Sequence, residues 1–405
     1  MTLVDLRDCA VIAPNLHRRY SGITSVVITI VPELAKHIAI ASVGPHLPAR
    51  VPRIKWWQLF TQGWSKPSIS SPPLKGGKLD GGSSTPTNFD ALPPTPTLTP
   101  PLSGGGNILQ KRIWHARRND EMIVGIILRD ILRQPWLLTF TSTAQRHHTA
   151  FTRFLMRRMD ALLAGSSKAA SYLEIPAMVI DNSIPTANFS PAPNRLEAWQ
   201  ETGLPGKYGI GVFGRVRHQK GTDLFVEAMC RLLPRYQDFT AVIVGLSAPE
   251  QKTFTDKLKT RIKDAGLEQR IVFIGEVASE DVPKWFARLT IYVAPMRWEG
   301  FGLTPIEAMA SEVAVVATTA GAHEQIVVEG ETGHLVQPGD VEALTNAIEP
   351  LMADPEKAFS MGKKGQEKAL EKHDVAIEAE KTLLAYKLMW EGRALPDERP
   401  ARKSR

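Results

Sequence analysis

Cysteine is scarce in this chain of 405 residues, which carries only Cys9 and Cys230. Two thiols this far apart in the sequence argue against a disulfide framework and against a cysteine-based zinc site, and they suit a reducing compartment. No run of about 18 uncharged apolar residues occurs, so no transmembrane helix is expected. The N-terminal segment places charged side chains ahead of a short apolar run, unlike a secretory signal peptide. These absences predict a cytoplasmic protein that is soluble or peripheral to a membrane.

Motifs for dinucleotides and metals are missing as well. No Gly-x-Gly-x-x-Gly follows the first expected strand, at 9–13, which disfavours a dehydrogenase. The sequence contains no Asp-x-Asp. His147 and His148 are adjacent, so they lack the four-residue spacing with which two histidines bind a metal on a helix. We therefore expect neither a metal site nor a bound cofactor.

The charge of the chain is unevenly distributed. Apolar residues make up 43% of the sequence, which excludes disorder throughout, and the formal charge is +7. Residues 1–182 hold 21 basic and 11 acidic side chains, whereas the remainder holds 28 and 31. The basic first half predicts an anionic partner, and a solvated basic surface is the simpler alternative.

Proline and glycine mark the segments outside the domains. Residues 65–106 contain nine prolines and seven glycines. Such a segment buries too little apolar surface to offset its ordering entropy, so we predict a disordered surface insertion; a proline-rich docking ligand is the alternative. A second proline cluster, at 182–206, marks a domain boundary. The basic tail from Pro396 to Arg405 is expected to be frayed.

Elsewhere, strand and helix patterns alternate, which predicts α/β domains with parallel sheets. In the first half, strands are expected at 9–13, 38–43, 113–116, 137–141 and 161–165, with helices at 25–36, 120–133 and 143–158. In the second half, strands are expected at 208–214, 241–245, 271–275, 291–294 and 313–318. The helices expected there are at 222–233, 250–265, 279–289, 304–310 and 341–352, followed by one or two amphipathic helices over 355–390.

The first chemical motif is the loop from Gly214 to Gly221, which carries Arg215 and Lys220 between an expected strand and an expected helix. Ligands of α/β sheets bind at the carboxyl ends of strands, and a helix N-terminus offers free N–H groups to a phosphate. Two cations in this loop would hold a diphosphate. A basic surface loop is the simpler alternative.

The second motif runs from Glu299 through Gly-Phe to Gly302 and on to Glu307, so that two carboxylates flank a glycine turn. At a strand end, glycine lets the backbone approach a ligand, and the Glu299 carboxylate can accept hydrogen bonds from sugar hydroxyls. Glu307 has a structural alternative, because Thr304 at the N-cap, Pro305 and Glu307 would form a capping box. An acid–base pair of a hydrolase is a further alternative.

Loops of the first half carry candidate ligand contacts. Gly22 leads into a helix and is a candidate phosphate contact. The histidines and arginines of these loops are candidates for binding the acceptor. The alternative to acceptor binding is that they are simply exposed to solvent or make a structural hydrogen bond. The candidate acceptor-binding residues are His17, Arg18, Arg19, His115 and Arg117.

Together, these motifs resemble the retaining glycosyltransferases of family 4, which have the GT-B fold. The resemblance is carried by Phe213-Gly214-Arg215, by Lys220-Gly221, and by Glu299 and Glu307 with seven residues between them. It covers the chain except 65–106 and the tail. It implies two Rossmann-like domains facing a central cleft: an acceptor domain at 1–182, a linker at 183–206, a nucleotide-sugar domain at 207–374, a helix at 375–390 that crosses back to the first domain, and a tail at 391–405.

The resemblance also implies roles for residues of the second domain. Arg215 and Lys220 would hold the diphosphate and stabilise the leaving group without a metal, and Glu299 would contact the donor sugar. Glu307 would bind the ribose hydroxyls. The other predicted donor contacts are Gly22, Gly214, Glu276, Val277, Gly302, Leu303 and Thr304.

A closer similarity is to the lipopolysaccharide core mannosyltransferases of alphaproteobacteria, in the stretches 117–122, 213–226 and 302–305. It implies transfer of α-mannose from GDP-mannose to a Kdo residue of a lipid A precursor at the cytoplasmic leaflet of the inner membrane. Such an acceptor is anionic and suits the basic first half, since each cation near an anionic leaflet contributes ~1 kcal/mol. The chain departs from the family pattern at Ser21-Gly22, at Thr141-Ser142-Thr143 and at Asn182-Ser183-Ile184-Pro185.

Three alternatives stay open at this point. A family 4 transferase could use a UDP-hexose on another lipid-linked or oligosaccharide acceptor. Sugar-nucleotide epimerases share the two-domain fold, but they lack this pair of glutamates. A non-catalytic module would bind a nucleotide sugar, or a peptide through 65–106.

Overall fold

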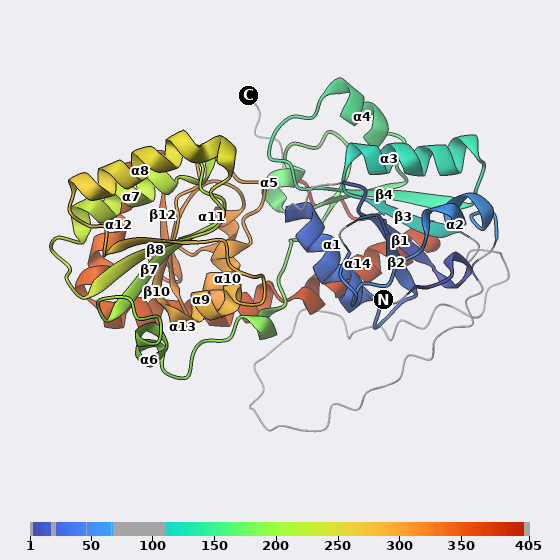
Figure 1. Ribbon diagram of the computed structural model, residues 1–405. Helices are drawn as coiled ribbons and strands as arrows, with labels where there is room; N and C mark the ends of the chain where they lie inside the picture. The colour runs from blue at the N-terminus through green and yellow to red at the C-terminus, as the bar shows by residue number, and fades with distance from the viewer. Residues whose placement is uncertain (1–2, 18–21, 46, 66, 68–110, 401–405) are drawn as a thin grey trace, which may run out of the picture. The chain divides into compact units, whose positions relative to one another are not determined.

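The computed structural model describes residues 3–17, 22–45, 47–65, 67 and 111–400 (Figure 1). Nearly all of the predicted insertion lies outside these residues, as do the last residues of the tail. By its internal contacts the chain divides into two compact units. Unit 1 comprises Met1–Phe140, Ala150–Leu162 and Thr382–Leu395, and unit 2 comprises Thr141–Thr149, Leu163–Lys381 and Pro396–Arg405. The predicted boundary at 182 does not coincide with this division, which assigns 163–182 to unit 2.

The first sheet has six strands in the order β2-β1-β3-β4-β5-β6. Val11 lies opposite Ile40 on one side and opposite Ile113 on the other, in parallel register. The central strands are buried on both faces, which explains their continuous apolar runs. The strands are β1 (Val11–Pro14), β2 (Ile40–Val43), β3 (Arg112–Ala116), β4 (Trp136–Ser142), β5 (Ala161–Ala164) and β6 (Met178–Val179). The helices up to the second sheet are η1 (Leu6–Asp8), α1 (Gly22–Leu34), α2 (Trp56–Thr61), α3 (Asn119–Ile126), the π-helical η3 (Ile127–Ile131), α4 (Ala150–Met156), α5 (Ser167–Ala170), η4 (Thr186–Asn188) and α6 (Arg195–Gln200).

The second sheet lies wholly in unit 2 and has the order β12-β11-β10-β7-β8-β9, with every neighbouring pair parallel. Its strands are β7 (Tyr208–Phe213), β8 (Phe239–Val244), β9 (Ile271–Gly275), β10 (Leu289–Ala294), β11 (Ala314–Thr318) and β12 (Gly333–Val336). Its helices are η5 (His218–Lys220), α7 (Thr222–Leu232), η6 (Pro249–Gln251), α8 (Lys252–Asp264), α9 (Val282–Arg288), α10 (Thr304–Ala310), α11 (His323–Ile326), α12 (Val341–Ala353), α13 (Pro355–Lys372) and α14 (Val375–Trp390).

Two apolar cores sandwich the second sheet. Ile210 and Val212 of β7 face a cluster formed with α7, α8 and α12, whereas Phe213 joins a cluster with Phe286 of α9 and Ile306 of α10. Figure 1 shows the helices in two layers, one on each face of this sheet. Because successive side chains of a strand point to opposite faces, strands covered on both sides must be apolar at nearly every position.

One expected helix is shorter than predicted, and some short elements were not predicted. The helix expected at 143–158 is helical only over Ala150–Met156. Four of the seven residues at 143–149 are Thr or His, which are weak helix formers, and the Ser142 Oγ lies 3.1 Å from the His148 Nε2. The elements α2, β6 and β12 were not predicted.

The first part of the tail is not frayed. The Asp397 and Glu398 carboxylates accept hydrogen bonds from the backbone N–H groups of Ala177 and Val179. Glu398 N–H in turn donates to the Ala177 carbonyl at 3.0 Å. The unpaired backbone beside β6 is satisfied in this way. Among the residues that the structure describes, no helix has the length and apolarity needed to cross a bilayer.

Candidate active site

Three glycines mark the carboxyl ends of neighbouring strands in the second sheet. Gly214 follows β7, Gly245 follows β8 and Gly275 ends β9, with φ of 126°, 143° and 84°. A side chain at Gly245 would place its Cβ 2.0 Å from the Gly214 carbonyl oxygen. Glu276, which is exposed, and Val277 follow directly after Gly275. The predicted contacts for the base and the diphosphate therefore lie at one edge of this sheet, where α/β proteins bind ligands.

The loop after β7 carries the two predicted cations. Gly221 has a φ of 70°, and a Cβ there would lie 1.9 Å from the Pro295 carbonyl oxygen, so the loop passes directly against the one after β10. The Arg215 side chain is exposed. The Lys220 side chain is only 19% exposed. α7 begins immediately after this loop, which adds the free N–H groups of a helix N-terminus to the two cations.

An ion pair that the sequence analysis did not single out joins the two loops. Arg297 binds both carboxylate oxygens of Asp223 at 2.7 Å. The same guanidinium donates to the His218 carbonyl at 2.7 Å, and Gln219 Nε2 donates to the Trp298 carbonyl at 3.1 Å. Bidentate arginine–carboxylate pairs fix geometry as well as adding energy. This clamp holds η5, and with it the Lys220 backbone, against the loop after β10.

Lys220 and Glu299 meet directly. The Lys220 ammonium donates a hydrogen bond to Glu299 Oε2, and each side chain is 19% exposed. Glu299 Oε1 accepts a further hydrogen bond, at 3.0 Å, from the Gly300 backbone N–H. Burial by itself would raise the pKa of Glu299, but the charge and hydrogen bond of Lys220 outweigh it and hold the pKa below the ordinary value. Glu299 is therefore an ionised carboxylate at neutral pH.

The turn after Glu299 rests on the loop after β11. Gly302 has a φ of 96°, and a Cβ there would lie 2.3 Å from His323 Nε2. A Cβ at Gly321 would lie 2.6 Å from the Phe301 carbonyl oxygen. His323 Nδ1–H donates to the Thr318 carbonyl at 2.8 Å, and burial lowers the pKa of this histidine to about 4, so the ring is neutral. His323 was not among the predicted site residues, although the expected strand at 313–318 and the glycine that follows it place it beside the site.

Glu307 does not form a capping box. The N-cap of α10 is Leu303, not Thr304, and the N-cap has no side-chain hydrogen bond. No described residue donates a hydrogen bond to the Glu307 carboxylate. Burial raises the pKa of Glu307 to about 7, opposed by the charge of Lys220. The capping-box alternative is therefore wrong, and ligand binding by Glu307 stays a prediction.

The predicted acceptor residues of unit 1 have different surroundings. Arg18 and Arg19 lie outside the described residues, and His17 is exposed. His115 is buried, with its Nδ1 2.6 Å from the Tyr386 hydroxyl of α14. This contact gives His115 a structural partner. Acceptor binding by His115 stays a prediction.

A buried glutamate joins the two loops that carry these residues. Glu121 of α3 accepts hydrogen bonds from the backbone N–H of Arg117 at 2.7 Å and of Leu16 at 3.3 Å. Burial raises the pKa of Glu121 to about 7, against the two backbone hydrogen bonds. Gly22 begins α1, next to the first of these loops. Glu121 thus positions the loop after β1 and the loop after β3 relative to each other.

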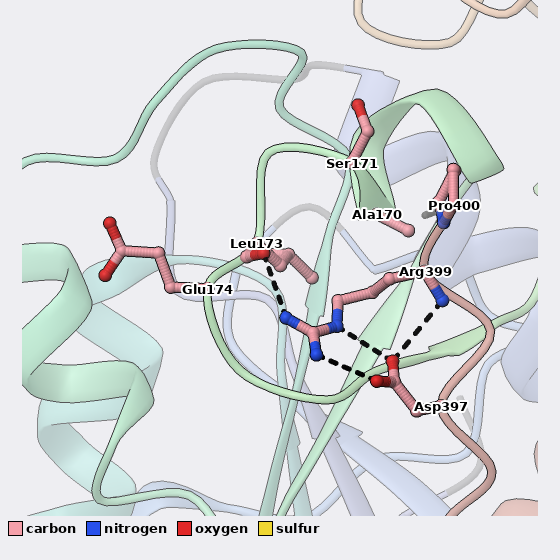
Figure 2. Close-up of a pocket in the computed structure, with 7 residues that line it drawn as sticks. All are labelled: Ala170, Ser171, Leu173, Glu174, Asp397, Arg399 and Pro400. Carbon is pink, nitrogen blue, oxygen red and sulfur yellow. Dashed lines mark hydrogen bonds and ion pairs between the residues drawn. The ribbon is translucent and has the colours of Figure 1, made fainter. Parts of the chain in front are cut away.

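No group of three or more His, Cys, Asp or Glu side chains in the described part of the chain is arranged to hold a metal ion. A surface pocket of about 410 Å³ lies elsewhere, beside α5 and the tail (Figure 2). Its one cation, Arg399, already pairs with both oxygens of Asp397 at 2.8 Å and donates to the Leu173 carbonyl. None of the predicted site residues lines this pocket, so it is not the candidate site.

Comparison with known proteins identifies relatives along most of the chain. A family model for glycosyl transferases group 1 matches residues 196–368. The lipopolysaccharide core biosynthesis mannosyltransferase LpcC of Rhizobium leguminosarum bv. viciae is 46% identical over 359 residues, which are 88% of this chain and 90% of that protein. The corresponding LpsB of Rhizobium meliloti strain 1021 is 41% identical over 356 residues, 87% of this chain and 90% of that protein.

Solved structures of low identity share the fold. Anabaena HepE in complex with UDP superposes with a TM-score of 0.72 at 18% identity, over 93% of this chain and 99% of that chain. Sucrose-phosphate synthase from Thermosynechococcus elongatus gives a TM-score of 0.69 at 18% identity, over 95% and 100%. The two parallel six-stranded sheets with their helices have the GT-B fold. Because its identity to LpcC and LpsB extends over most of all three chains, the protein belongs to their family and is a glycosyltransferase.

Proposed function

We propose that this enzyme transfers α-mannose from GDP-mannose, with retention, to a Kdo residue of the lipopolysaccharide inner core, at the cytoplasmic leaflet of the inner membrane. The observation that carries the sugar and the pathway is the 46% identity to a lipopolysaccharide core mannosyltransferase over 88% of this chain. The observation that supports the chemistry is the pairing of Lys220 with Glu299 at a strand end of the second sheet.

The cationic loop suits a diphosphate. An ammonium has three N–H donors, and Lys220 gives one of them to Glu299, so two are left for phosphate oxygens. Arg215 lies on the same loop and would add a planar pair of donors. As the bond between the sugar C1 and the diphosphate breaks, charge gathers on the departing oxygen. Lys220 and Arg215 would stabilise that charge, which is the electrostatic role proposed here in place of a metal.

The two glutamates suit hydroxyl groups. Glu299 is ionised and held in place by Lys220 and by the Gly300 N–H, so its oxygens can accept hydrogen bonds from the donor sugar. Glu307 has no donor among the described residues and would accept from the ribose. The predicted contacts between the two glutamates, Gly302, Leu303 and Thr304, would follow the sugar and the phosphates.

Retention requires the acceptor hydroxyl to attack C1 on the face from which the diphosphate departs. The new bond joins the acceptor oxygen to C1, the bond from C1 to the diphosphate oxygen breaks, and the acceptor proton passes to the departing diphosphate. No protein side chain is needed as the base in this step. The cations of the loop after β7 keep the departing group in place while the acceptor attacks.

Radiolabelled GDP-mannose, UDP-glucose and UDP-galactose, each incubated with a Kdo-containing lipid A precursor, test the proposal. We expect label in the lipid fraction from GDP-mannose alone, unchanged by a chelator, and an α-linkage in the product by NMR. Lys220→Ala should lower turnover at least tenfold, about 1.4 kcal/mol of barrier. Lys257→Ala, at an exposed lysine of α8, is the matched control and should leave turnover unchanged.

Each part of the proposal has its own contrary result. Transfer from a UDP-hexose without transfer from GDP-mannose overturns the donor. A β-linked product overturns retention, and loss of activity with the chelator overturns the role given to the cations. Labelling of an acceptor that lacks Kdo, with none of the Kdo-containing lipid, overturns the acceptor.

A further inference from the structure

Unit 1 exposes an unusual number of large aromatic side chains. Among the described residues, seven tryptophan and phenylalanine side chains are exposed, and six of them belong to unit 1. Four of the six lie within nine residues of sequence, on α2 and just after it. Contiguous exposed apolar surface of this kind commonly marks an interaction site.

α2 has the reverse of the usual arrangement for a surface helix. Its inner positions, Gln58 and Leu59, are buried: Gln58 Oε1 accepts from the Lys55 N–H at 2.7 Å, and the Leu59 carbonyl accepts from Gln134 Nε2 at 2.8 Å. A soluble helix turns its polar residues to water. Here the outward side chains are aromatic and 41–53% exposed, namely Trp56, Trp57, Phe60 and Trp64 beyond the helix end.

The exposed apolar surface continues onto η3. Trp64 Nε1–H donates to the Leu132 carbonyl at 2.9 Å, which places the indole beside the end of η3. Ile131, the neighbour of Leu132, is 68% exposed, and Ile127, one turn earlier, is 37% exposed. We define the aromatic patch as Trp56, Trp57, Phe60, Trp64, Ile127 and Ile131.

Around α2 the charge is of one sign, and Asp130, the carboxylate of η3, is paired with Arg129 and Arg158. Between Glu33 and Asp80 the sequence contains no carboxylate and seven lysines and arginines. Arg50, Lys55 and Arg133 flank the patch in sequence and are exposed, and no carboxylate in the described ranges pairs with any of them. Cations without acidic partners, next to exposed indoles, would suit a partner whose outer layer is anionic and whose interior is apolar.

We propose that the aromatic patch, with Arg50, Lys55 and Arg133, docks unit 1 on an anionic phospholipid bilayer. Tryptophan is favoured at the membrane–water interface, because its ring is apolar while its N–H reaches a polar partner. A helix that presents apolar side chains outward lies in the plane of that interface. The cations add attraction to anionic headgroups that falls as salt is raised. The proposal rests on the proposed function, because the lipid-linked acceptor is the reason for the enzyme to bind a membrane. Its test needs neither the donor nor the acceptor.

Vesicle binding by the purified full chain is the test. We expect the chain to sediment with vesicles of phosphatidylcholine and phosphatidylglycerol, and brominated lipid to quench its tryptophan fluorescence. Trp57→Ser/Phe60→Ser should lower the partition coefficient at least tenfold. Lys55→Gln/Arg133→Gln should also lower it about tenfold at low salt, with a smaller difference at high salt.

Matched variants on unit 2 show whether the effect belongs to the patch. Leu196→Ser/Leu370→Ser removes two exposed leucines, and Lys257→Gln/Lys263→Gln removes two exposed cations of α8. Both should bind vesicles as the unchanged chain does. Turnover on a soluble Kdo-containing fragment, if the proposed function holds, should be the same for the patch variants and the unchanged chain.

Several results would overturn the docking proposal. One is equal vesicle binding by the patch variants and the unchanged chain. Another is a patch variant that converts a dimer to a monomer in size-exclusion chromatography while vesicle binding is absent throughout, which assigns the patch to a second copy. A third is vesicle binding that appears only after deletion of residues 68–106, which assigns the patch to the insertion. Failure of mannose transfer with vesicle binding intact contradicts the proposed function alone.

Discussion

Replacing Lys220 by alanine removes one partner of a largely enclosed ion pair. Glu299 stays in place, ionised, with the Gly300 N–H as its one remaining hydrogen-bond donor. The influence of burial on Glu299, which raises its pKa, is then no longer outweighed by a neighbouring cation. The variant should therefore be less stable at neutral pH, because the Glu299 charge has lost its partner. It should also be less active, because the diphosphate contact proposed for Lys220 is lost.

The size of the stability loss follows from the enclosure of the pair. Removing one partner of a buried ion pair costs about 3–5 kcal/mol. Both side chains are 19% exposed, so we expect the lower end, about 3 kcal/mol. For a unit of this size, that corresponds to a fall of about 6–12 °C in the melting temperature.

The contribution of Glu299 to the pH dependence of stability has opposite signs in the unchanged chain and in Lys220→Ala. In the unchanged chain the pKa of Glu299 lies below 4.5, so the stability that it contributes is present above pH 4.5 and is lost as the pH falls through the lowered pKa. In Lys220→Ala burial raises the pKa of Glu299, so the variant regains stability as the pH falls through the raised pKa. Thermal melting between about pH 5 and 8 measures the difference.

A second substitution separates stability from catalysis. Lys220→Ala/Glu299→Gln removes the uncompensated charge, so it should recover about half of the lost melting temperature and stay as inactive as the single variant. Lys207→Ala is the control, because the Lys207–Asp238 pair is 64% and 55% exposed and should contribute little. The reasoning is refuted if Lys220→Ala melts like the unchanged chain at neutral pH, or if the double variant melts below the single one.

Three further predictions concern other polar groups of the described structure. Glu307→Gln should raise the KM for the donor at least tenfold; it should also remove a loss of stability that the unchanged chain shows between about pH 4.5 and 7, because a raised carboxyl pKa disfavours the ionised, folded form as the pH rises. A donor KM that does not change contradicts the assignment to the ribose. Arg297→Ala and Asp223→Asn should each raise the donor KM about tenfold, and together should cost little more than either alone; additive losses, measured in a double-mutant cycle, contradict the clamp. Tyr386→Phe should lower the free energy of unfolding by about 1 kcal/mol, measured by denaturant titration, without changing the acceptor KM, and a selective rise in that KM places His115 at the acceptor instead.

The expected elements of the second sheet agree with the structure because their signals are local. The helix expected at 304–310 is α10, and the strand expected at 271–275 is β9. β9 is an apolar run that ends at Gly275, and α10 has Pro305 in its first turn, just after Gly302. β12 was not anticipated, since Gly333–Val336 is short and becomes a strand only by pairing with β11. The helix α2 was missed because its aromatic side chains face outward, against the periodicity that indicates a soluble helix.

The candidate site residues could be named from the sequence, but the contacts between them could not. Arg215, Lys220, Glu299 and Glu307 stand in motifs that the sequence displays directly. That Lys220 binds Glu299, 79 residues away, depends on β7 and β10 being neighbours in the sheet. The capping-box alternative for Glu307 is wrong because α10 begins one residue earlier than that pattern requires, with Leu303 instead of Thr304 at the N-cap.

The sequence by itself determined the alternation of apolar strands and amphipathic helices, the glycine positions at strand ends, and the residue types needed to bind a diphosphate and hydroxyl groups. These are local properties, set by side-chain chemistry and spacing. Only the tertiary structure decided that Arg297 and Asp223 join the loops after β10 and β7, that His323 supports the turn at Gly302, and that α2 turns its tryptophans outward. Each of these depends on which strands pair and which surfaces pack, and that is settled by contacts between residues far apart in the chain.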